Sequence, residues 1–106
     1  MGIKGDVNLL LVGDREIQKI NRRYLHHDYA TDVIAFEMKE HGVFGDIVVS
    51  TDAAKRQARE EGHSVLTETT ILVVHGMLHL LGYRDKKKKD RDRMWRKTND
   101  LMKRVS

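Results

Sequence analysis

The chemically distinctive residues of this chain are two histidines, His75 and His79, which lie four positions apart in the apolar segment "ILVVHGMLHLL". Residues at this spacing lie on the same side of a helix, so both imidazoles can face one divalent ion. Burying two polar rings is costly unless something binds their lone pairs. The pattern therefore predicts a metal site on a helix, and the alternative is a pair of core histidines satisfied by hydrogen bonds.

A third candidate ligand follows the helix. Gly82 permits a sharp turn, and Asp85 comes ten residues after His75. Two imidazole nitrogens and one carboxylate form a candidate set for one Zn²⁺ ion per chain, with a fourth position open for water. Such an ion lowers the pKa of water and polarises the scissile group, which is hydrolase chemistry. A metalloprotease is disfavoured because Gly76 stands where that mechanism requires glutamate. A glycine within a helix also predicts that something approaches it closely.

Hydrophobic periodicity predicts the elements that position these residues. In chain order they are a buried strand over 7–12, a helix with Asp14 as its N-cap, strands over 33–36 and 47–49 that pair as a hairpin, a helix ending at Gly62, a helix from about Ser64 to Leu81, and a C-terminal helix with Trp95 on its apolar face. We predict one α/β (α+β) domain over 1–106, in which a small mixed sheet packs against helices and the histidine helix is central.

Composition narrows the class of protein. The chain has 106 residues and no cysteine, so disulfides and thiolate chemistry are excluded and a metal must be held by His, Asp or Glu. No apolar run is long enough to span a bilayer, and no signal peptide is recognisable, so we expect a cytoplasmic protein without a membrane partner. Residues 84–106 hold 11 Lys or Arg and 4 Asp or Glu. This cluster predicts either a phosphate-bearing partner or a solvated helix face.

The segment "HGMLHLLGY" (75–83) resembles the signature of the YbeY endoribonucleases, metal-dependent proteins of ribosomal RNA maturation. The resemblance extends over nearly the whole chain, because the segments "NRRY", "TDVIAF", "GDIVVS", "AKRQA" and "GHS" occur in the family's order with compatible spacing. It implies a small α/β fold with the ligand helix at its centre, zinc as cofactor, and single-stranded or ribosomal RNA and ribosomal proteins as partners. The candidate RNA-binding residues are Arg22, Arg23, Lys86, Lys87, Lys88 and Lys89.

The chain departs from the family pattern at the positions expected to bind the metal and the phosphate. Asp85 stands where the family usually has its third histidine ligand, and Arg84 replaces the aspartate before it. Leu25 stands where many members have an arginine thought to contact phosphate, and the candidate substitutes are Arg22, Arg23 and Arg84. Members begin with a further strand and helix before the strand expected at 7–12, which predicts an exposed sheet edge here and a homodimer through it. The lack of proline, including at Glu37, adds the hypothesis of an engineered chain.

Two aspartates are candidates to support the metal ligands. Asp32 in "TDV" and Asp46 in "GDI" are expected to accept the second N–H of a metal-bound imidazole, with turn formation as the equal alternative. The sequence thus favours a zinc-dependent, single-strand-specific endoribonuclease of ribosomal RNA maturation. The alternatives are a catalytically weakened RNA- or ribosome-binding module and an engineered scaffold on the same fold.

Overall fold

The sheet is mixed, and its strand order is β1-β3-β2. In this computed structural model, which describes residues 5–40, 43–84 and 86–105, β1 (Asp6–Val12) runs parallel to β3 (Val43–Ser50), and β2 (Val33–Glu40) runs antiparallel to β3. A parallel neighbour needs a crossover, which α1 (Asp14–Leu25) supplies together with β2. The predicted hairpin and mixed sheet are confirmed.

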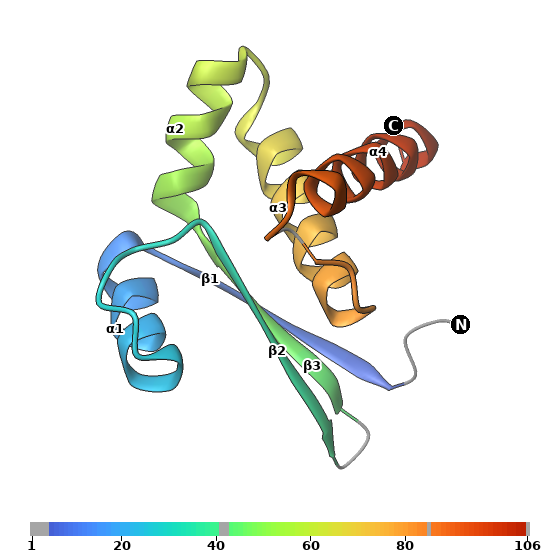
Figure 1. Ribbon diagram of the computed structural model, residues 1–106. Helices are drawn as coiled ribbons and strands as arrows, with labels where there is room; N and C mark the ends of the chain where they lie inside the picture. The colour runs from blue at the N-terminus through green and yellow to red at the C-terminus, as the bar shows by residue number, and fades with distance from the viewer. Residues whose placement is uncertain (1–4, 41–42, 85, 106) are drawn as a thin grey trace.

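Helices cover both faces of this sheet. Figure 1 shows α1 on one side, and α3 (Val65–Leu80) and α4 (Lys88–Val105) on the other, with α2 (Thr51–Glu61) leading from the end of β3 to α3. Alternate residues of β3 divide between the two faces, as the period of a strand requires. The α3 face buries Ile47, Val49, Ala54, Leu72 and Leu80, and the α1 face buries Ile17, Ile34 and Val48. The histidine helix is therefore a central element of the fold, as predicted.

Gly76 allows α3 to approach the sheet closely. A Cβ atom at this position would lie 2.8 Å from Cγ2 of Ile47, whose side chain is fully buried. The close approach predicted from a glycine within the helix is thus confirmed, and the approaching group is a strand side chain. This contact places the turn of α3 that carries His75 directly above β3.

The ends of α3 follow the capping residues of the sequence. Gly62 ends α2 with a φ of 72°, and the Ser64 side chain accepts a 3.0 Å hydrogen bond from the N–H of Thr67. At the other end, Gly82 adopts a φ of 101°, which a glycine reaches at little cost. The N–H of Tyr83 then donates to the carbonyl of Leu78 at 3.0 Å, so the chain folds back over the last turn of the helix.

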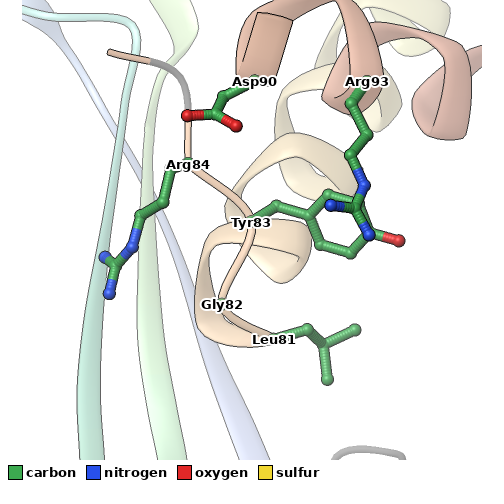
Figure 2. A pocket seen from close by; sticks show the side chains of 6 residues that line it. All are labelled: Leu81, Gly82, Tyr83, Arg84, Asp90 and Arg93. Atoms are coloured by element: carbon green, nitrogen blue, oxygen red, sulfur yellow. The ribbon is translucent and has the colours of Figure 1, made fainter. Parts of the chain in front are cut away.

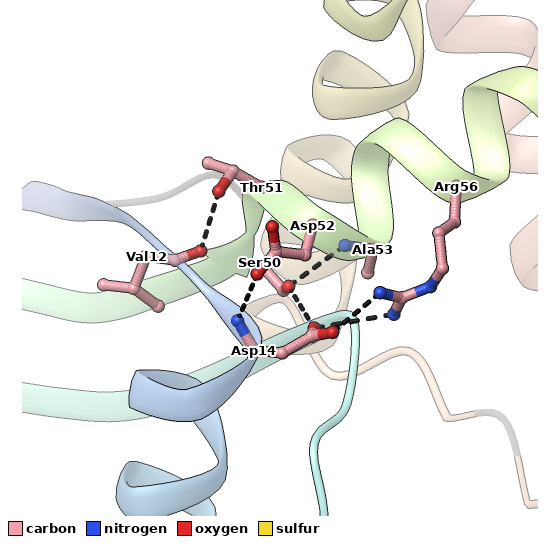
Figure 3. Close-up of polar contacts among 7 residues, drawn as sticks. All are labelled: Val12, Asp14, Ser50, Thr51, Asp52, Ala53 and Arg56. Carbon is pink, nitrogen blue, oxygen red and sulfur yellow. Dashed lines mark hydrogen bonds and ion pairs between the residues drawn. The ribbon is translucent and has the colours of Figure 1, made fainter.

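Asp14 was predicted to cap α1, and that prediction is wrong. Gly13 is the N-cap, and the Asp14 carboxylate instead accepts hydrogen bonds from Oγ of Ser50 and Nη1 of Arg56, both at 2.7 Å (Figure 3). The backbone N–H of Asp14 donates to Asp52 at 2.8 Å. The hydrogen bond from Arg56, followed by that from Ser50, lowers the pKa of the Asp14 carboxyl below its ordinary value. Asp14 therefore fastens the start of α1 to the start of α2.

Two predictions of burial are also wrong. The strand expected to be buried is the edge strand β1, where Leu9, Leu10 and Leu11 are 48%, 43% and 54% exposed. Trp95, expected in the core, is 54% exposed, whereas Met94 and Thr98 of α4 are buried. A local apolar pattern cannot tell which neighbour covers an element, and that is decided only when the elements assemble. Within the described residues, none of the helices combines the length and apolar composition needed to cross a membrane.

Candidate metal centre and nucleic-acid interface

The two motif histidines lie side by side on α3. Their ring centroids are 4.9 Å apart with an interplanar angle of 81°, and both side chains are half-buried. The i, i+4 spacing brings the rings together on one face, and the Gly76 contact with Ile47 fixes the height of that face above the sheet. Two imidazoles at this separation suit two nitrogen ligands of one divalent ion.

The end of α3 orients one of these rings. Nδ1 of His79 lies 3.2 Å from the backbone carbonyl oxygen of Tyr83. A carbonyl oxygen can only accept, so Nδ1 is the donor in this hydrogen bond. Metal-binding histidines commonly show this arrangement, in which a carbonyl or carboxylate holds the other ring nitrogen. The turn at Gly82 therefore does more than end the helix, because it returns the Tyr83 carbonyl to His79.

Asp85, predicted as the third ligand, lies outside the described residues. Among residues 5–40, 43–84 and 86–105, no three His, Asp or Glu side chains are grouped closely enough to hold one ion. The structure therefore brings together two of the three predicted ligands. Their nitrogens fit the donor set of zinc, and the identity of the third ligand stays a prediction.

Arg84 lines two cavities, one of which His79 also lines. One, of about 390 Å³, is formed by the turn after α3 and the start of α4 (Figure 2). In it the guanidinium of Arg93 lies 5.8 Å from the centroid of the Tyr83 ring, while the Arg84 side chain points away toward the strands. The residues that line this cavity are Leu81, Gly82, Tyr83, Arg84, Asp90 and Arg93.

The second cavity, of about 320 Å³, lies between the end of α1, β2 and the end of α3. Arg84 and His79 both line it, so the predicted phosphate-binding cation and one metal-motif histidine meet here. Leu25, Tyr29 and Glu37 line it as well. The cleft thus combines an imidazole, a guanidinium, a carboxylate and apolar side chains.

The whole chain, residues 1–106, matches the model of the family described as "Endoribonuclease YbeY". The chain belongs to the YbeY family. An endoribonuclease YbeY of Bacillus licheniformis is 40% identical over 112 residues, covering 93% of this chain and 71% of the relative. One of Aquifex aeolicus is 40% identical over 101 residues, covering 92% and 67%. The solution structure of TM1509 from Thermotoga maritima has a TM-score of 0.68 at 32% identity, covering 95% of this chain and 68% of that one. The resemblance found in the sequence motifs is thereby confirmed.

The two aspartates proposed to support the ligands lie on different faces of the sheet. Asp32 lines a cavity of about 540 Å³ together with His75, and its carboxylate accepts a 3.1 Å hydrogen bond from Gln57. Asp46 lies two residues before Val48 on β3, so both side chains are on the α1 face of the sheet. There Asp46 lines a cavity and accepts a 2.9 Å hydrogen bond from Asn8. Asp32 thus lines the same cavity as His75, whereas Asp46 lines a cavity on the α1 face.

The predicted RNA-binding cations are exposed, but they form two groups. Arg22 and Arg23 lie at the end of α1, where Arg22 approaches Asp28 at 4.0 Å and Arg23 lies 5.5 Å from the ring centroid of Tyr24. The lysine segment, Lys86 to Lys89, leads into α4, and Lys88 is its first helical residue. Only the lysine segment is close in sequence to Arg84 and to the YbeY signature.

Sequence reasoning missed one feature of this site. The loop after α1 presents the rings of His27 and Tyr29 stacked on each other, with centroids 5.4 Å apart and planes 11° from parallel. Two aromatic residues two positions apart in a polar loop were the available signal, but their place beside His79 depends on the packing of α1 and α3 on the sheet.

Proposed function

We propose that this chain is a metal-dependent endoribonuclease that cleaves single-stranded RNA during ribosomal RNA maturation in the cytoplasm. Membership of the YbeY family supports the class of reaction. The observation that carries the proposal is the His75–His79 pair, with ring centroids 4.9 Å apart, at a cleft that His79 shares with Arg84.

His75 and His79 would hold one Zn²⁺ per chain, and we propose Asp85 as the third ligand. Zinc held there would supply Lewis-acid activation of water and of the phosphodiester. The Tyr83 carbonyl accepts a hydrogen bond from Nδ1 of His79, so Nε2 would be the nitrogen that binds the ion. Asp32, in the cavity that His75 lines, is proposed to stabilise the orientation of that ring.

Arg84 is proposed to bind the scissile phosphate. A guanidinium offers a planar fork of N–H donors that matches phosphate oxygens, and it stays charged at all relevant pH values. Its position in the cleft with His79 suits stabilisation of the negative charge that develops on the phosphate. Leu25 in the same cleft offers no such donor, so we propose Arg84 as the residue that binds the phosphate.

The lysine segment is proposed to attract RNA. Lys88 and Lys89 belong to the first turn of α4, where the positive end of the helix dipole disfavours cations by about 0.3–1 kcal/mol each. Their position therefore does not serve helix stability. Four adjacent exposed lysines that closely follow Arg84 in the sequence suit the sugar-phosphate backbone of ribosomal RNA, with ribosomal proteins as further proposed partners.

Elemental analysis combined with a cleavage assay tests this function. The purified protein should contain one zinc per chain and should cut a single-stranded oligoribonucleotide faster than the same sequence in a duplex. His75→Ala should remove both the zinc and the cleavage. A protein that takes up no zinc, or a His75→Ala variant that cleaves as fast as the parent, would contradict the proposal.

A second candidate function is an RNA- or ribosome-binding module with weakened cleavage. It is favoured by Leu25, which lines the cleft where many family members are expected to carry a cation. Such a module binds single-stranded RNA in a salt-dependent way but does not cut it. A scaffold with neither activity would show neither property, so the same assay separates all three.

We also propose that the free edge of β1 pairs with β1 of a second copy. In the part of the chain that the structure describes, β1 pairs with β3 alone, and three successive leucines on it are exposed. An exposed apolar edge strand offers unpaired N–H and C=O groups to another strand. Antiparallel pairing of two identical edges satisfies these groups and buries the leucines around a twofold axis.

A further inference from the structure

The stacked pair His27–Tyr29 is an unusual feature of an exposed loop. The Tyr29 side chain is 55% exposed, His27 is exposed as well, and the Tyr29 hydroxyl lies 3.3 Å from Nδ1 of His27. The two parallel rings cover each other without entering either core cluster. The pair therefore presents a flat aromatic surface to solvent.

A single buried residue holds the backbone on both sides of this pair. Asn21, which is 2% exposed, accepts a 3.3 Å hydrogen bond from the N–H of His27 at its carbonyl oxygen. Its side-chain amide donates a 3.0 Å hydrogen bond to the carbonyl oxygen of Tyr29. Asp28, which lies between His27 and Tyr29 in the sequence, accepts a 3.1 Å hydrogen bond from Gln18 of α1. The loop is thus tied to a helix and its rings are pre-organised, which lowers the entropic cost of binding a ligand.

The pair lines the same cavity as His79 and Arg84. The stacked rings, the apolar side chain of Leu25 and the guanidinium of Arg84 all line this cavity. A nucleotide has matching properties, because its base is flat and apolar on both faces and its phosphate is anionic. Leu25 cannot bind a phosphate, so the rings and Leu25 suit the base, and Arg84 suits the phosphate.

We infer that His27 and Tyr29 form a stacking platform for one base of the RNA substrate, next to the phosphate that Arg84 binds. This inference rests on the proposed function and adds the recognition of the strand. A base in a duplex has both faces covered by its neighbours, whereas an unpaired base can leave the strand and stack on an aromatic side chain. The platform therefore gives the enzyme its preference for single-stranded RNA.

Binding of a labelled 2′-O-methyl RNA single strand, measured by fluorescence anisotropy and checked on a gel for integrity, tests the platform. Tyr29→Ala should raise the Kd by roughly tenfold, which corresponds to about 1.4 kcal/mol. Tyr29→Phe keeps the ring and should stay within about twofold of the parent. Tyr24→Ala is the matched control, because Tyr24 is 60% exposed but lines a different cavity, and its Kd should not change.

A set of strands with one abasic residue at each position in turn identifies the stacked base. One abasic position should weaken binding of the parent protein by the same factor as Tyr29→Ala, and combining the two should add nothing further. If Tyr29→Ala loses its fold by circular dichroism, Tyr29→Leu replaces it, since leucine fills the space without a ring.

The outcomes separate the platform from the proposed function. If the parent binds and Tyr29→Ala binds equally well, the platform is wrong and the function stands. If Tyr29→Phe loses as much affinity as Tyr29→Ala, the contact is a hydroxyl hydrogen bond, which also overturns stacking. If the parent chain binds no single-stranded RNA, both proposals fall.

Discussion

Nδ1 of His79 lies 3.2 Å from the backbone carbonyl oxygen of Tyr83, four residues later in the chain. The contact exists because Gly82 turns the chain back after α3. Because a carbonyl oxygen only accepts, Nδ1 is the donor in this contact, and Nε2 is the nitrogen that we propose for the metal ion. The turn that ends α3 therefore also orients the ring of His79.

This contact predicts different roles for the two nitrogens of His79. In His79→Asn the side-chain amide can still donate to the Tyr83 carbonyl, but no atom replaces Nε2. We expect the variant to lose its zinc, measured by plasma mass spectrometry, while the melting temperature of the metal-free protein changes little. His26→Asn, in the loop after α1, is the control and should keep its zinc, because asparagine tolerates the φ of 60° found there. Retention of zinc by His79→Asn would exclude His79 as a ligand.

Gly76→Ala should destabilise the protein although alanine favours helices by about 1 kcal/mol over glycine. The new Cβ would lie 2.8 Å from Cγ2 of Ile47, which is fully buried and cannot move aside. Overpacking of this kind costs about 1–3 kcal/mol, so we expect a net loss in the free energy of unfolding measured in urea. Leu66→Ala on the exposed face of the same helix is the control. An unchanged or higher urea midpoint for Gly76→Ala would show that α3 is not in close contact with β3.

Asp14→Asn should lower stability at neutral pH and flatten its dependence on acid. The pKa of Asp14 is lower in the folded chain than in the unfolded one, owing first to the hydrogen bond from Arg56 and then to that from Ser50. The stabilisation is therefore complete above the unfolded pKa of about 3.9 and is lost as the pH falls through the folded pKa.

Asp14→Asn should lower the free energy of unfolding at neutral pH by only about 1 kcal/mol. The effect is small because the Arg56 side chain is largely exposed and its ion pair with Asp14 is screened by water. Thermal unfolding followed from pH 7 down to the acid limit measures both effects. Glu16→Gln removes a carboxylate from the same helical turn and should retain the acid dependence of the parent. Equal pH profiles for Asp14→Asn and the parent would show that this carboxylate does not link α1 to α2.

The double variant Lys87→Ala/Lys88→Ala should bind RNA more weakly, and its binding should depend less steeply on salt than that of the parent. Each phosphate contact to a single strand contributes about 0.7 to the slope of log K against log salt, so the loss of two contacts should lower the slope by about 1.4. Lys55→Ala/Arg59→Ala on α2 makes the same change in net charge at exposed positions away from the cleft. If both double variants change the slope equally, RNA responds to net charge and not to the lysine segment.

Leu9→Lys should give a monomer if the β1 edge forms a dimer. In a symmetric dimer, the lysine at position 9 of one copy would lie close to the same lysine of the other copy, and the two charges would repel. Natural proteins often carry lysine on edge strands, where it prevents such pairing. Size-exclusion chromatography with light scattering over a range of concentrations measures the mass. Leu66→Lys changes a leucine that is 77% exposed on α3 and should leave the dimer intact. A parent chain that stays monomeric at every concentration would contradict the edge pairing.

Local rules were sufficient for the elements and for the pairing of the two motif histidines. The predicted order of strands and helices, the hairpin, and the limits of α3 at Ser64 and Gly82 all agree with the structure. They depend on hydrophobic period, capping oxygens and glycine conformation, which act within a few residues. The His75–His79 pair was predictable for the same reason, since one helical turn brings the rings together.

Tertiary structure alone decided which side each element faces and what meets at the cleft. Asp32 and Asp46 have similar local contexts, yet the assembled sheet places only Asp32 near His75. The exposure of the β1 leucines, the exposure of Trp95, and the meeting of His27 and Tyr29 with His79 likewise depend on contacts between elements far apart in the chain. Short-range patterns determine what a segment can form, whereas the packing of α1, α3 and α4 on the sheet determines its neighbours.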